Sequence, residues 1–144
     1  VKHHLADPAL AARLLGASRE ALLNESTPAG ATPRMGPLLG ALFESLVTLC
    51  IRVYAQAAES SIHHLRTWDG RHEVDLIVQR ADQRVVALEV KIAPTVGDDD
   101  VAHLRWLRDR LGEDLLDAAV VTTGPAAYRR ADGIAVVPLA LLGP

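Results

Sequence analysis

The sequence predicts an α/β domain in which a mixed central β-sheet is flanked by helices, and three observations support this prediction. A long, largely apolar helix is expected over residues 38–59. Two segments of alternating apolar residues, 73–79 and 85–92, enclose a polar stretch of hairpin-loop length. A helix-like segment precedes a short apolar run over 118–122, which indicates a strand parallel to the sheet interior.

The first 37 residues are expected to form an N-terminal linker segment with a short strand and helices. Asp7 is a suitable N-cap and Pro8 a suitable first residue for a helix that continues to about Leu15. A second short helix is expected over 18–23. The stretch 27–37 contains three prolines and two glycines, which predicts a loop. Residues 38–144 are then expected to form the main domain.

Within this main domain, Glu44 and Arg52 interrupt the apolar helix, which favours the central helix of a soluble domain over a membrane span. The remaining elements follow from the strand pattern and from turn and cap residues. We expect a strand over 61–66, a turn over 68–70, N-cap acids at 98–100, a helix over 101–110 closed by Gly112, a strand over 134–137 and a short C-terminal helix.

The loop between the two alternating segments predicts their register. If residues 80–84 turn symmetrically about Asp82, Asp75 lies directly opposite Glu89. Their Cβ atoms would then be about 4.5–5.5 Å apart, and like charges at that distance destabilise a sheet. Lys91 follows on the same face, two residues further along. Two carboxylates and a lysine in this arrangement are typical of a divalent-cation site in a nuclease.

An ordinary ion pair is the alternative explanation, because the same register places Glu73 across from Lys91. Against it, Lys91 is one of only two lysines, whereas thirteen arginines carry the rest of the positive charge. An ammonium differs chemically from a guanidinium. The strand 85–92 is nearly all apolar, so its charges are expected in a cleft, where they need partners or a function. Both explanations stay open at this point.

Composition and charge limit the function classes. The formal net charge of −3 argues against strong nucleic-acid binding, because phosphate contacts need a basic surface. Aromatic residues make up only 3%, which disfavours a base-stacking platform. Cys50 is the single cysteine, so an internal disulfide is excluded and a reducing cytoplasm is expected. DNA is therefore a possible but weak partner.

Three segments together resemble the PD-(D/E)XK nuclease superfamily: Gly40 to Glu44, Glu73 to Val78, and Glu89-Val90-Lys91. More narrowly, the chain from Gly40 to Leu141 looks like the domain called DUF4143, which follows an AAA-type ATPase module and a winged helix in many bacterial and archaeal proteins. Lys2 to Asp7 resembles the joining segment, so residues 1–37 are expected to continue from such an upstream region. The resemblance implies a restriction-endonuclease-like αβββαβ core.

The same resemblance implies roles for individual residues. Asp75 and Glu89, with the main-chain carbonyl of Val90, would bind Mg²⁺ or Mn²⁺. Lys91 would orient or deprotonate the attacking water, and Glu44 would be an accessory acid. The implied reaction is phosphodiester hydrolysis in DNA. The chain has no Gly-x-x-x-x-Gly-Lys-Ser/Thr loop, so no ATP site of that kind is expected in it.

Two functions of different class follow. One is a metal-dependent deoxyribonuclease domain that serves an ATPase module of the same protein. The other is a catalytically silent module that uses the same fold for protein interaction or assembly, and homo-oligomers are possible in either case. Fold alone does not decide between them.

Overall fold

The computed structural model describes residues 4, 6–23 and 36–143, and the chain divides into two compact units, 1–49 and 50–144. The first unit contains α1 (Pro8–Leu14), α2 (Arg19–Leu23) and the beginning of α3 (Gly36–Ala57). The border between the two units lies within α3. Asp7 caps α1 as predicted, because its carboxylate accepts bonds from two N–H groups of the first turn, each at 2.9 Å.

For the first unit, one prediction lies outside the described residues and another is corrected by the structure. The expected opening strand and most of the expected loop over 27–37 lie outside the described residues. The end of that loop was placed wrongly, since Gly36 and Pro37 already belong to α3. Proline is tolerated in the first turn of a helix, where its missing N–H costs nothing. Among the described residues, α3 is the one helix long and apolar enough to span a membrane, which by itself is weak evidence.

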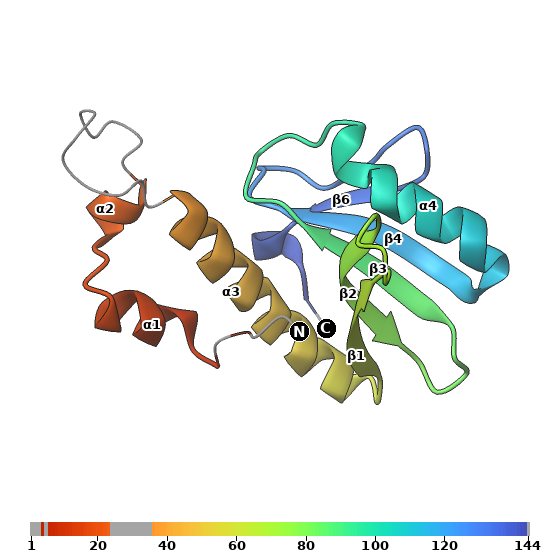
Figure 1. Cartoon of the computed structure of the whole chain (residues 1–144), viewed down its shortest axis with the longest axis horizontal. Coiled ribbons are helices and arrows are strands. Elements are labelled where there is room, and N and C mark those ends of the chain that lie inside the picture. Colours follow the sequence, from red (N-terminus) through yellow and green to blue (C-terminus); the bar gives the residue numbers. More distant parts are fainter. Residues whose placement is uncertain (1–3, 5, 24–35, 144) are drawn as a thin grey trace. The chain divides into compact units, whose positions relative to one another are not determined.

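The second unit is built on a six-stranded mixed sheet with the order β1-β2-β3-β4-β6-β5 (Figure 1). Its strands are β1 (Ser61–Arg66), β2 (Glu73–Gln79), β3 (Val85–Val90), β4 (Leu115–Thr122), β5 (Tyr128–Arg129) and β6 (Ala135–Pro138). The pairs β1–β2, β2–β3 and β5–β6 are antiparallel, whereas β3–β4 and β4–β6 are parallel. The predicted mixed sheet with flanking helices is confirmed.

The crossover from β3 to β4 covers one face of this sheet. It consists of η1 (Asp99–Val101), α4 (Ala102–Leu111) and η2 (Gly112–Asp114), and Figure 1 shows α4 lying across the strands. Leu104 and Leu107 of α4 are buried in one cluster with Ile77 and Ala87 of the hairpin. This is the face on which the alternation also places Asp75 and Glu89. The α4 face therefore carries both the core and the predicted acids.

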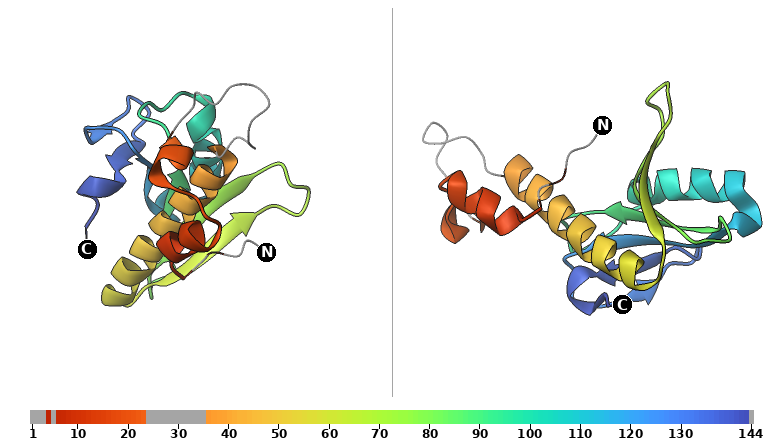
Figure 2. Two further views of the ribbon diagram at one scale, coloured as in Figure 1. Left: turned by 90° about the vertical axis from the view of Figure 1, so that its left-hand side faces the viewer. Right: turned by 90° about the horizontal axis from the view of Figure 1, so that it is seen from below.

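The register of the β2–β3 hairpin agrees with the prediction. Leu76 pairs with Leu88 and Gln79 with Val85, so the turn is symmetric about Asp82. The Asp82 carboxylate holds that turn by accepting bonds from the Arg84 main-chain N–H at 3.2 Å and from its guanidinium at 2.8 Å. Figure 2 shows β1 and β2 as a twisted ribbon, and the turn between them projects from the sheet.

Three predictions about elements were incomplete or wrong. The two-residue edge strand β5 was not predicted, and the C-terminal helix is the 3₁₀ turn η3 (Leu139–Leu141). The acids Asp98–Asp100 were predicted to cap the following helix, but Asp98 makes no capping bond, and its carboxylate binds two arginines.

Candidate functional site

The candidate site lies where β2 begins and β3 ends, because antiparallel strands bring these two ends together. The Asp75 carboxylate accepts a hydrogen bond of 2.9 Å from the main-chain N–H of Val90. Asp75 is thereby fixed beside the last residues of β3. The pairing of β2 with β3 ends at Leu76 and Leu88, and one further step in the same register would bring Asp75 opposite Glu89.

A pocket of about 200 Å³ opens at this end of the sheet. The strands contribute Glu89, Val90, Lys91 and Val120 to its wall, and the crossover contributes Asp99, Asp100 and His103. Most of these side chains are ionisable, so the pocket presents carboxylates, an ammonium and an imidazole to one small volume. Such a concentration of titratable groups in a concave site is typical of a functional site.

The main chain of Lys91 is held in place beside the pocket by a hydrogen bond. Its N–H donates to the Val121 carbonyl at 2.9 Å, which extends the β3–β4 pairing by one residue. Its Nζ lies 2.5 Å from one carboxylate oxygen of Asp100, and the other oxygen accepts from the Gly97 N–H at 2.9 Å. The Lys91 ammonium and then the Gly97 N–H hold the pKa of Asp100 below its usual value.

Lys91 therefore does not form the ion pair with Glu73 that was the alternative explanation, because its partner is Asp100. Glu73 is directed toward β1, where it lies 3.6 Å from His64 and 3.9 Å from Arg66. The physical reason is the strand order, since β2 is hydrogen-bonded to β1 on that side and Glu73 pairs with Arg66 in the register. The carboxylate that neutralises Lys91 comes instead from the crossover loop.

Two histidines and a tryptophan, which the sequence analysis did not connect, lie beside this pocket. The Nδ1 atoms of His103 and His72 are 3.4 Å apart. The His72 ring stacks on Trp106 with a centroid separation of 4.0 Å and an interplanar angle of 6°. His72 precedes β2 and the other two residues belong to α4, so only the tertiary fold brings them together. Trp106 also packs against the core, as predicted.

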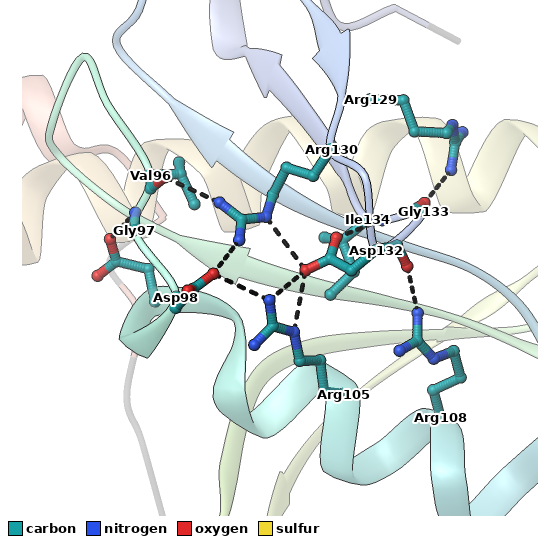
Figure 3. A network of polar contacts seen from close by, with 11 residues as sticks. Val96, Gly97, Asp98, Arg105, Arg108, Arg129, Arg130, Asp132, Gly133 and Ile134 are labelled. Carbon is teal, nitrogen blue, oxygen red and sulfur yellow. Dashed lines mark hydrogen bonds and ion pairs between the residues drawn. The ribbon is translucent and has the colours of Figure 1, made fainter.

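A network of arginines and aspartates anchors the loop that leads into the pocket (Figure 3). Arg105 and Arg130 both bind Asp98 and Asp132. Arg130 also donates to the Val96 carbonyl at 3.0 Å. Burial raises the pKa of Asp132, but Arg105, the Ile134 N–H and Arg130 outweigh it and lower that pKa to about 2. The segment just before Asp100 is thus held from two sides.

Three arginines, on β1, on the turn before β2 and on α4, also lie against carboxylates. Arg66 lies 3.9 Å from Glu73, and Arg71 lies 3.4 Å from Asp69. Arg105 belongs to the network just described. Each of these charges faces a carboxylate, so little positive charge remains uncompensated for a phosphate backbone. Weak DNA affinity stays a prediction.

The donor atoms of the predicted metal set fit a hard cation. Asp75, Glu89 and the Val90 carbonyl would supply oxygen only, which suits Mg²⁺ or Mn²⁺ with several retained waters. Within the described ranges, no three side chains of His, Cys, Asp or Glu gather closely enough to hold a metal by themselves. Glu44 lies on α3 in the first unit, and its role as an accessory acid stays a prediction.

Comparison with known proteins gives one match. The family model described as "Domain of unknown function (DUF4143)" matches residues 39–142, which is more than half of the chain. No curated protein and no solved structure matches the chain.

Proposed function

Because the chain belongs to the DUF4143 family, whose function is unknown, we propose a function from its own site: a metal-dependent, nuclease-like domain that hydrolyses phosphodiester bonds in DNA. One observation carries the proposal. The Val90 N–H donates to the Asp75 carboxylate, and Val90 lines the pocket together with Glu89 and Lys91. The arrangement matches the order and spacing of the PD-(D/E)XK motif.

Each candidate residue has its own role in the proposed reaction. Asp75, Glu89 and the Val90 carbonyl would hold one Mg²⁺ or Mn²⁺ ion, with the remaining positions left for water and a phosphate oxygen. Such an ion would supply Lewis-acid chemistry, namely activation of the attacking water and neutralisation of charge on the phosphate. Lys91 orients that water and balances the charge that builds up during the reaction. Glu44 is the accessory acid of this proposal.

The proposal also includes the surroundings of the domain. An AAA-type ATPase module of the same protein is the proposed partner, and the compartment is the cytoplasm. DNA affinity within the domain itself is modest, because nearby arginines already pair with carboxylates. The ATPase module would then bring DNA to the pocket, which removes the need for a strongly basic surface here.

Calorimetric titration with Mn²⁺ tests the metal site. The wild-type chain is compared with Asp75→Asn, which keeps an acceptor for the Val90 N–H, and with Glu89→Gln. Asp109→Asn is the matched control, because it removes one negative charge from an exposed position on α4. We expect wild type and control to bind and both site variants to lose binding. Equal Mn²⁺ binding by all four proteins would contradict the metal site.

Hydrolysis is tested separately with single-stranded, duplex and branched DNA in the presence of Mn²⁺. Lys91→Met should abolish cleavage while it leaves Mn²⁺ binding in place, since the lysine acts on the water and the phosphate. One observation favours the alternative of a silent assembly module: Arg66, Arg71 and Arg105 all face carboxylates. Metal binding without any cleavage would support that alternative.

A further inference from the structure

We propose that Asp100 is the positioning residue of this site: it fixes the Lys91 ammonium at the wall of the pocket. Asp100 lies outside the motif that the sequence shares with nucleases, nine residues beyond Lys91. The consequence for hydrolysis rests on the proposed function, whereas the positioning itself can be tested without any activity.

Contacts on both sides of the Asp100 carboxylate support this role. One oxygen lies 2.5 Å from Lys91 Nζ, and the other accepts from the Gly97 N–H at 2.9 Å. The Asp100 side chain is only 19% exposed, whereas that of Lys91 is 50% exposed. A half-exposed lysine loses its rotamer freedom only when a fixed partner holds its end. Asp100, clamped by its own loop, is such a partner.

The loop that carries Asp100 is itself anchored independently of Lys91. Val96 and Asp98 are bound by Arg130, and Asp98 is also bound by Arg105 of α4 (Figure 3). On the other side, Val101 and Leu104 are fully buried in the core. Asp100 lies between these two fixed segments, so its carboxylate is held at a defined point on the pocket wall.

The geometry of an ammonium explains why the position of Lys91 would affect the rate of a reaction. Lysine has three N–H donors. When one of them is directed to Asp100, the directions of the other two are fixed, and they become available to a water or a phosphate oxygen in the pocket. Precise placement of such a group contributes to rate, and a displacement of about 1 Å can cost on the order of 100-fold.

The test compares Asp100→Asn with Asp99→Asn in the full 144-residue chain. Both residues line the pocket, and both changes remove one negative charge, but the contact to Lys91 belongs to Asp100. Asparagine has one carbonyl oxygen, so it can serve Gly97 or Lys91 but not both. An amine-reactive label reports whether Lys91 is held. Lys2 is the only other lysine, so its peptide is the internal reference in mass spectrometry.

We expect Asp100→Asn to raise the labelling rate of Lys91 several-fold relative to Lys2, and Asp99→Asn to leave it unchanged. Asp100→Glu should restore part of the protection. Equal labelling of Lys91 in wild type and Asp100→Asn, with melting curves that show both are folded, overturns the proposal. An equal rise in Asp99→Asn also overturns it, because general pocket charge would then be the cause.

Two further measurements separate positioning from metal binding and from the proposed function. Mn²⁺ affinity should be retained in Asp100→Asn; loss of binding would make Asp100 a ligand and overturn the proposal. If cleavage is measurable, kcat should fall roughly 10- to 100-fold with little change in KM. If wild type neither binds Mn²⁺ nor cleaves DNA, the proposed function fails, and the labelling result still decides the positioning.

Discussion

At the scale of single residues, Asp132 has the clearest effect on stability. Its pKa in the folded protein is about 2, below the ordinary value of 3.8 for an aspartate. A carboxylate with a depressed pKa stabilises the fold above the unfolded value, and that contribution disappears as the pH falls through the folded value. We therefore expect the melting temperature to decrease between about pH 4 and pH 2, and less steeply in Asp132→Asn than in wild type. Calorimetric scans across this range provide the measurement, and equal slopes would contradict the assignment.

The two tryptophans provide a second prediction about single residues. Trp68 is fully exposed in the β1–β2 turn, whereas Trp106 stacks on His72 and packs against the core. Trp106→Ala should lower the free energy of unfolding by about 2–4 kcal/mol, because it leaves a cavity and removes the stack. Trp68→Ala should change it by less than about 0.5 kcal/mol. Denaturant unfolding followed by circular dichroism distinguishes them, and similar losses would contradict this packing.

The partner of Lys91 shows why part of the site could not be predicted. The observed register of β2 and β3 follows from one short turn, since the polar residues 80–84 and the alternation of both strands specify it. Asp100 reaches Lys91 through a nine-residue excursion whose course depends on Arg105 and Arg130. Long-range ion pairs of this kind have no signature in local sequence.

At the scale of elements, Gly124 is the position where β4 leaves the sheet and passes close to the loop after β3. A Cβ atom at Gly124 would lie 2.8 Å from the Pro94 carbonyl oxygen, which real contacts do not allow. Gly124→Ala should therefore push the two segments apart and destabilise the domain by about 1–3 kcal/mol. Thermal unfolding measures this, with Gly143→Ala as the control because nothing lies within 4 Å of its Cβ position. An unchanged melting temperature would contradict the close approach.

Elements with strong local signals were the ones predicted well. The strand Ser61–Arg66 and the helix capped by Asp7 agree with expectation because alternation and capping are local properties. The edge strand β5 has only two residues and no alternation to detect. The acids Asp98–Asp100 were assigned as caps from their position alone, but arginines from α4 and from the residue after β5 bind the Asp98 carboxylate. Tertiary contacts, which local sequence does not show, therefore determine both the strand β5 and the partners of Asp98.

At the scale of the whole molecule, the net charge of −3 and the carboxylate partners of the arginines predict weak DNA binding. Binding of a labelled duplex by Asp75→Asn, which should not cleave it, can be followed by anisotropy at several salt concentrations. The slope of log K against log salt should be no steeper than about −2, equivalent to about two phosphate contacts. A slope near −6 would show that the ion pairs open on DNA and would contradict this prediction.

The strand order described above also has a consequence for the path by which the chain folds. The strands β1, β2 and β3 follow one another directly, so their pairing needs only short loops to close. The pairing of β3 with β4 must wait for the whole crossover, which spans η1, α4 and η2. Because contacts distant in sequence form more slowly, Asp75 should meet the end of β3 early, and Asp100 should reach Lys91 late. Asp75 would then be in place at the end of β3 before the pocket is complete.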